Sequence, residues 1–98
     1  VNEGDEIAKA LGDKKVAILQ NHGILTTGPS VDIALWFYMS MERCCQAQLM
    51  AEAAGKPISV SHETAIKTRE FIANDIAAWA SYQPAFDKIV KMQPDLLD

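Results

Sequence analysis

The sequence has no apolar run long enough to cross a lipid bilayer. Its longest strongly apolar stretch, Val31 to Met41, is eleven residues long and includes Asp32, whereas a membrane-spanning helix needs about 20 residues. Basic residues are also sparse, because the formal net charge is -4 and Lys14-Lys15 is the one basic cluster. We therefore expect no nucleic-acid or membrane partner, which leaves small molecules and other proteins.

Cysteine is scarce as well. The two cysteines, Cys44 and Cys45, are adjacent in a segment with a helical pattern, so their side chains diverge by about 100° and cannot easily bridge each other. No second pair stands at zinc-ligand spacing, which favours packing over zinc binding for these two. Unpaired cysteines fit a reducing compartment, and we expect a cytoplasmic protein.

The length of the chain allows at most one small domain. Its 98 residues are 49% apolar, which is enough for a core but leaves a modest margin of stability. The chain does not begin with Met, and residues 1–6 are acidic. We therefore expect no secretory signal and a piece of a longer protein.

A polar corner, Asn21-His22-Gly23, is where the chemistry of this chain is expected. The branched apolar run 16–19 predicts one strand, and residues 24–27 predict a second. Asn21 and Gly23 tolerate left-handed backbone angles, so they can turn the chain while His22 projects from the turn. A rigid hairpin tip of this kind is a good place for a ligand.

His22 does not make a metal site by itself. Zinc needs about three protein ligands, and no Glu or His at helical or hairpin spacing accompanies His22. On the residues alone, a histidine that caps a hairpin is favoured over a metal ligand. His62, in the first turn of a later helix, is expected at the surface.

Helices are expected on both sides of the hairpin. A short helix over about 3–11 precedes it, and a long helix over about 31–54 follows, with Ser30 as its N-cap. The first half of the long helix is apolar nearly all round. Two explanations stay open, burial within one domain or contact with another subunit. Because two strands make no stable sheet alone, further strands are expected from elsewhere.

Two more helices are expected after the long one. The first would begin at Ser61 and end near residue 80, and a short last helix would start at Gln83-Pro84 and end before Pro94. Helical periodicity predicts a buried stripe on the first of them, formed by Ala65, Ile66, Ile72, Ala73, Ile76, Ala77, Trp79 and Ala80.

Three segments carry a family resemblance. They are IAKALGDKK over residues 7–15, VAILQNHGILTTG over residues 16–28, and ERCCQAQL over residues 42–49. Together they resemble the carboxy-terminal half of the class II aldolase and adducin head-domain family, well over residues 3–55 and more weakly beyond. The resemblance implies that residues 1–98 are the carboxy-terminal part of a single domain of this family.

The resemblance also implies a fold and a metal ligand. The fold would be α/β, a three-layer α/β/α sandwich around a mostly antiparallel sheet, usually assembled as a homo-tetramer. This chain would contribute a helix, a β-hairpin, a long helix and two further helices. His22 would be the last of three histidine ligands to zinc or another divalent metal. The metal would polarise the substrate carbonyl and stabilise the enediolate formed when a carbon-carbon bond breaks.

The other functional groups of the family lie upstream of this chain. They are a His-x-His pair, an acid/base glutamate and the phosphate-binding loops, so Glu42, Glu63 and His62 are not assigned to these roles. No substrate-binding residue is indicated, and the metal site of this chain is expected to be incomplete.

Three functional hypotheses result. The first is part of a metal-dependent aldolase-type lyase, or a related epimerase or dehydratase, acting on a small sugar-phosphate-like or hydroxy-keto substrate. The second is an adducin-like head domain, a non-catalytic assembly or cytoskeletal-binding module. The third is a fragment that is inactive alone. The presence of His22 favours descent of this chain from an enzyme of the first kind.

Overall fold

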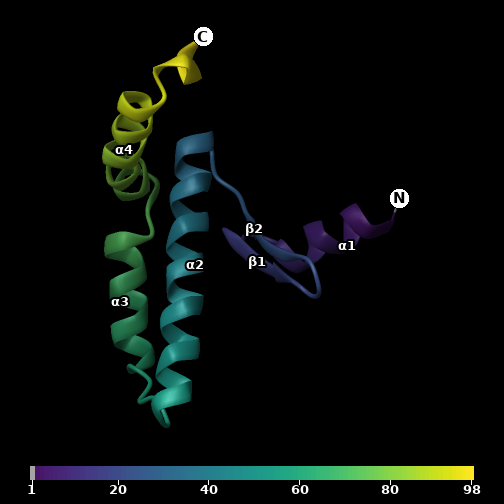
Figure 1. Ribbon diagram of the computed structural model, residues 1–98. Coiled ribbons are helices and arrows are strands. Elements are labelled where there is room, and N and C mark those ends of the chain that lie inside the picture. Colours follow the sequence, from purple (N-terminus) through teal and green to yellow (C-terminus); the bar gives the residue numbers. More distant parts are fainter. Residues whose placement is uncertain (1) are drawn as a thin grey trace.

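The computed structural model describes residues 2–98, which form helices packed beside one β-hairpin (Figure 1). The elements are α1 (Asn2–Leu11), β1 (Val16–Leu19), β2 (Gly23–Thr26), α2 (Val31–Ala54), α3 (His62–Ile72), α4 (Asp75–Met92) and a short 3-10 helix, η1 (Pro94–Leu97). The expected succession of helix, hairpin, long helix and further helices is therefore observed. Within residues 2–98, every helix is too short or too polar to span a membrane.

The hairpin has the tight antiparallel geometry that its sequence predicts. Ile18 pairs with Ile24 and Leu19 pairs with Gly23, so β2 begins one residue earlier than expected. The turn needs two unusual backbone conformations, which are supplied by Asn21 at φ 60° and Gly23 at φ 146°. The amide of His22 donates to the carbonyl of Leu19 at 3.1 Å and closes the turn.

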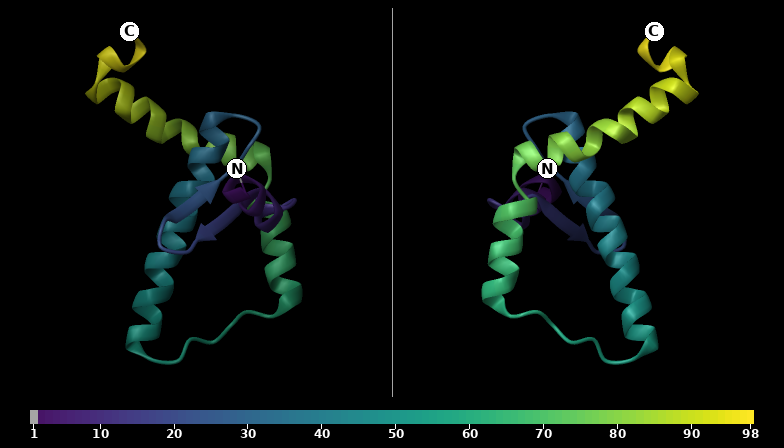
Figure 2. Two further views of the ribbon diagram at one scale, coloured as in Figure 1. Left: turned by 90° about the vertical axis from the view of Figure 1, so that its right-hand side faces the viewer. Right: turned by 90° about the vertical axis from the view of Figure 1, so that its left-hand side faces the viewer.

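The long helix α2 packs against the hairpin and against α4, whereas α1 packs on β1 and α3 contacts α4. α4 lies on one side of α2, and the hairpin with α1 lies on the other side (Figure 1). In the perpendicular views, α2 and α3 diverge toward the extended segment that connects them (Figure 2). The buried core consists of Ile33 and Phe37 of α2 and Ala78 of α4, and Val16 and Trp36 pack against it. The core therefore lies where α2 meets β1 and α4.

The boundary between the last two long helices differs from the expectation of a helix over 61–80 and a short one from Gln83-Pro84. α3 ends at Ile72 and α4 runs from Asp75 through Pro84 to Met92. The cause is Asn74, whose side-chain oxygen accepts from the amide of Ala77 at 2.9 Å and caps α4. The Asn74 amide group also donates to the Phe71 carbonyl at 3.0 Å, at the end of α3.

The predicted buried stripe is wrong over both helices. α3 has no buried residue and its Ile72 is 56% exposed. Over α4 the cause is the break at Asn74. Ile76 is 81% exposed and Trp79 is 51% exposed, whereas Ala78 is fully buried. The prediction assumed one unbroken helix, and the break between α3 and α4 shifts which face of α4 meets α2. At Pro84 the helix continues although the ring removes the hydrogen bond that its amide would make to Ala80.

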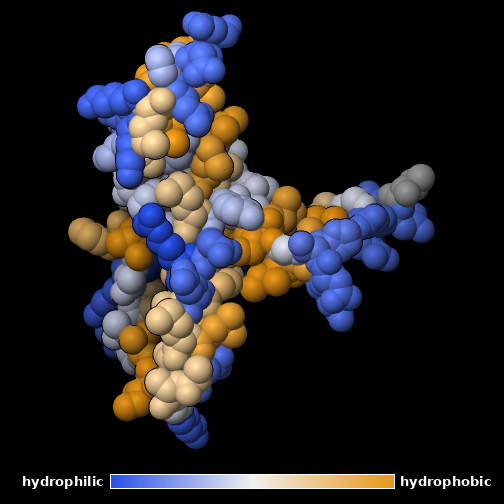
Figure 3. Space-filling model, in the orientation of Figure 1, coloured by the Kyte–Doolittle hydropathy of each residue, from blue (hydrophilic) through white to orange (hydrophobic). Residues whose placement is uncertain are grey.

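The chain is more open than a compact domain of its size. Its radius of gyration is 16.0 Å, against about 13 Å for 98 residues in a compact fold. Large apolar side chains are exposed on several elements, including Val31 and Phe71, and apolar surface covers the hairpin and much of the helical part (Figure 3). Residues 2–98 contain a two-stranded sheet, so this part of the chain does not by itself form the expected three-layer sandwich.

Candidate functional site

The hairpin tip presents His22 to solvent. Its side chain is 68% exposed, and its Nε2 atom lies 4.0 Å from a carboxylate oxygen of Glu3 in α1. Because both side chains are exposed, this contact contributes little to stability. The turn geometry is set by Asn21 and Gly23. The turn therefore fixes the backbone at His22, and the imidazole is exposed to solvent.

A metal would find one fitting ligand in this part of the chain. Among residues 2–98, no group of three or more His, Cys, Asp or Glu side chains is placed to hold a metal ion. His62 begins α3, and Cys44 and Cys45 are free thiols on α2. None of these three joins His22 in a cluster. An accessible imidazole on a rigid turn fits a single ligand position, and a complete site needs ligands beyond those described here.

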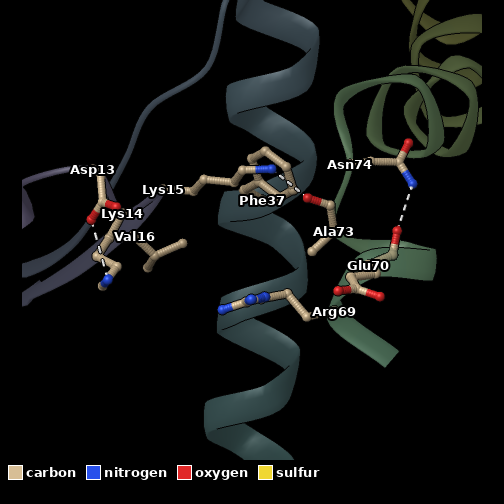
Figure 4. Close-up of a pocket in the computed structure, with 9 residues that line it drawn as sticks. All are labelled: Asp13, Lys14, Lys15, Val16, Phe37, Arg69, Glu70, Ala73 and Asn74. Atoms are coloured by element: carbon tan, nitrogen blue, oxygen red, sulfur yellow. Dashed lines mark hydrogen bonds and ion pairs between the residues drawn. The ribbon is translucent and has the colours of Figure 1, made fainter. Parts of the chain in front are cut away.

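A second polar site lies where β1, α2 and the α3–α4 junction meet. It is a cleft of about 670 Å³, which we call the Arg69 cleft (Figure 4). Val16, Phe37 and Ala73 provide its apolar surface. Its charged and polar lining consists of Asp13, Lys14, Lys15, Arg69, Glu70 and Asn74.

Lys15 fixes one wall of the Arg69 cleft. Its ammonium donates to the backbone carbonyl of Ala73, lies 3.9 Å from a carboxylate oxygen of Asp75, and sits 4.9 Å from the centre of the Phe37 ring. Lys14 is exposed, as is usual for a lysine in a turn, whereas Lys15 is half-buried. No local signal marked this role, because Ala73 is 58 residues away along the chain.

The other charges of the Arg69 cleft are at its rim. Lys14 donates to Asp13 at 3.2 Å. That hydrogen bond, together with the charges of Lys14 and Arg69, holds the pKa of Asp13 below its ordinary value. Among residues 2–98, no carboxylate lies within 4.0 Å of the Arg69 guanidinium. The side chain of Arg69 extends from α3 toward the side of α2 where β1 lies (Figure 4).

Comparison with known proteins points to one family. Residues 1–49 match the family described as Class II Aldolase and Adducin N-terminal domain. Decarboxylase NovR of Streptomyces niveus is 38% identical over 95 residues, which are 97% of this chain and 35% of that protein. A 4-hydroxy-3-prenylphenylpyruvate oxygenase/4-hydroxy-3-prenylbenzoate synthase of Streptomyces roseochromogenus subsp. oscitans is 36% identical over 97% of this chain and 34% of its own length.

A solved structure has the same arrangement of elements. L-fuculose 1-phosphate aldolase from Glaciozyma antarctica PI12 superposes with a TM-score of 0.89 at 37% sequence identity, covering 93% of this chain and 36% of that chain. The present chain thus spans about a third of the length of each of these relatives.

Proposed function

Because the chain belongs to the class II aldolase and adducin family, we propose that it is part of a metal-dependent lyase that breaks a carbon-carbon bond next to a carbonyl group. One similar protein is named as a decarboxylase and another as an aldolase, and both names describe cleavage of a carbon-carbon bond. The proposal further takes residues 1–98 to be the carboxy-terminal part of a single domain of this family.

The observation that carries the proposal is the position of His22. Its imidazole is exposed at the end of a hairpin whose turn is fixed by Asn21 and Gly23, so the ring is accessible to a metal. We propose that His22 is one ligand of zinc or another divalent metal. Such a metal supplies positive charge that stabilises the negative charge developing on a carbonyl oxygen during bond cleavage.

The proposed substrate is a small keto compound. One relative is named for L-fuculose 1-phosphate and another for 4-hydroxy-3-prenylphenylpyruvate, so sugar-phosphate-like and hydroxy-keto compounds are both in the class to be assayed. Epimerase and dehydratase activities on such compounds belong to the same proposal. The adducin-like alternative predicts that the protein carries no metal and cleaves none of these compounds.

We also propose a homo-oligomer, a tetramer by family resemblance, located in the cytoplasm. Exposed apolar side chains on α2, α3 and α4, such as Val31, Phe71 and Ile76, support an assembly in which this surface is covered. The free cysteines on α2 support a reducing compartment.

The test is a pair of variants in the protein of natural length, His22→Ala and the control His62→Ala. Metal content is measured by elemental analysis, and cleavage is measured with a ketose 1-phosphate and with an aryl pyruvate. His22→Ala should lose the metal and nearly all cleavage, whereas His62→Ala should keep both. A His22→Ala protein with unchanged metal content would rule out the ligand assignment, and a wild-type protein without metal would favour the adducin-like alternative.

A further inference from the structure

The Arg69 cleft lies at the opposite end of β1 from His22. β1 starts beside the cleft at Val16 and ends at Leu19, just before the turn that carries His22. A four-residue strand separates its ends by about 10 Å. The cleft and the hairpin tip are thus two separate places on the chain, and the chemistry of each can be tested without the other.

The cleft has the dimensions of a small-molecule site. Its volume of about 670 Å³ falls in the range of about 300–1,000 Å³ that is usual for ligand pockets. Its shape does not depend on one flexible loop, because β1, α2 and the α3–α4 junction all contribute to it. Lys15 ties these elements together through Ala73 and Asp75. The cleft is therefore preformed in this part of the chain.

Arg69 is the cation that remains available in the cleft. Lys15 is engaged with Ala73, Asp75 and the Phe37 ring, and Lys14 is engaged with Asp13. The guanidinium of Arg69 has no carboxylate within 4.0 Å among the described residues. A guanidinium presents several N–H donors in a planar fork that matches the two oxygens of a carboxylate.

The apolar surface of the cleft adds a second requirement for a ligand. Phe37 is only 7% exposed and belongs to the buried core, and Val16 packs against that core. Val16 is half-buried and leaves more apolar surface open to the cleft. A ligand with a hydrocarbon group can cover this surface while its charged end reaches Arg69. Small inorganic anions can pair with Arg69, but they have no hydrocarbon group to cover the apolar surface.

From these contacts we propose that the Arg69 cleft binds a small organic carboxylate with an aromatic or branched apolar group. The carboxylate pairs with the guanidinium of Arg69, and the apolar group lies against Val16, next to the small exposed part of Phe37. Glu70, on the rim of the cleft, weakens this binding because its negative charge opposes that of the ligand.

The test uses calorimetric titration of the natural-length protein with benzoate, and with acetate and benzamide as comparison ligands. Benzoate should bind more tightly than acetate, which lacks the ring, and more tightly than benzamide, which lacks the charge. Arg69→Gln should weaken benzoate binding by about tenfold or more, since a hydrogen bond to a charged group is lost. The matched control is Arg43→Gln, which removes an exposed arginine on α2 outside the cleft and should leave binding unchanged.

Two further variants keep the proposal falsifiable if Arg69→Gln folds poorly. Glu70→Gln should tighten benzoate binding, and His22→Ala should leave it unchanged because the hairpin tip is not part of the cleft. The proposal is overturned if benzoate does not bind, if acetate binds as tightly as benzoate, or if Arg43→Gln weakens binding as much as Arg69→Gln. Loss of benzoate binding in His22→Ala would place the ligand at the hairpin tip and would also overturn it.

Discussion

The ammonium of Lys15 lies 4.9 Å from the centre of the Phe37 ring and also donates to the Ala73 carbonyl. One side chain therefore joins the start of β1 to the core of α2 and to the end of α3. A cation over an aromatic face is attractive, and a charged donor to a carbonyl is stronger than a neutral one.

Replacement of Lys15 by Met should destabilise the fold. The methionine keeps most of the apolar stem but leaves the Ala73 carbonyl without its donor, so we expect a loss of about 1–2 kcal/mol in the free energy of unfolding. This loss is measured by urea denaturation, with unfolding monitored by circular dichroism. Lys14→Met is the control, because Lys14 is exposed and pairs with its neighbour Asp13, and its effect should stay within about 0.5 kcal/mol. Equal losses in the two variants would contradict the role of Lys15.

Asn74 should be sensitive to substitution although it is exposed. Its side chain caps α4 at Ala77 and also donates to carbonyls at the end of α3. Asn74→Ala should cost about 1 kcal/mol in the free energy of unfolding, the usual effect of losing an N-cap. Asn74→Ser keeps a capping oxygen and should recover most of that loss, as measured in the same denaturation experiment. If serine is as destabilising as alanine, the cap is not the cause.

Gly28 approaches α2 so closely that a side chain does not fit. A Cβ atom at this position would lie 2.9 Å from Cγ2 of Ile33 and 3.0 Å from the amide nitrogen of Ala34. Gly28→Ala should therefore lower stability by about 1–3 kcal/mol, the usual cost of overpacking a core. The control is Gly55→Ala at the end of α2, where nothing lies within 4 Å of the added atom. Thermal melts of the two variants should differ clearly in midpoint.

Acid should weaken the contact between α2 and α4. The hydroxyl of Ser30 donates to Asp32 and holds the pKa of Asp32 below its ordinary value of 3.8, and the amide of Gln83 in α4 adds to this from 3.2 Å. Because the pKa is lower in the folded chain, the contribution of Asp32 to stability is present above pH 3.8 and is lost as the pH falls through the lowered pKa.

The Asp32→Asn variant tests this pH dependence. Its thermal midpoint should fall less between pH 5 and pH 2 than that of the wild type, whereas Asp87→Asn, on the exposed face of α4, should follow the wild-type curve. Some acid sensitivity should remain in Asp32→Asn, because Lys14 also lowers the pKa of Asp13. A parallel curve for Asp32→Asn would show that its carboxylate contributes nothing.

Loss of the His22 imidazole should leave the metal-free protein almost unchanged in stability. Its one polar partner among the described side chains is Glu3 at 4.0 Å, and both are exposed. In protein stripped of metal by a chelator, His22→Ala should shift the free energy of unfolding by less than about 0.5 kcal/mol. A loss of 1–3 kcal/mol would instead indicate the hydrogen-bonding cap that the sequence left open.

The hairpin and the ends of α2 could be predicted because their signals are local. Asn21 and Gly23 have backbone requirements that few other residues meet, and Gly55 and Pro57 mark the end of a long helix pattern. The break at Asn74 could not be predicted in the same way. Apolar residues continue on both sides of Asn74. The sequence therefore does not show whether this asparagine lies inside one helix or caps the start of another.

The environment of Lys15 was also beyond sequence reasoning, because its partner Ala73 is brought near only by the packing of α4 on α2. In contrast, the position of His22, the candidate metal ligand, could be predicted from its two neighbours in the chain, Asn21 and Gly23. Its exposure at the hairpin tip agrees with that prediction. The role of His22 as a ligand stays a prediction.

The one-sided position of the core implies a gradient of local opening along α2. Its two buried residues, Ile33 and Phe37, are both in its first two turns, whereas Leu49 and Met50 near its other end are more than 60% exposed. Amide hydrogens near Phe37 should exchange with solvent only when the whole chain unfolds, and those of the last turns should exchange by fraying alone. For residues 2–98, the start of α2 thus unfolds together with the rest of the fold, whereas its last turns can open on their own.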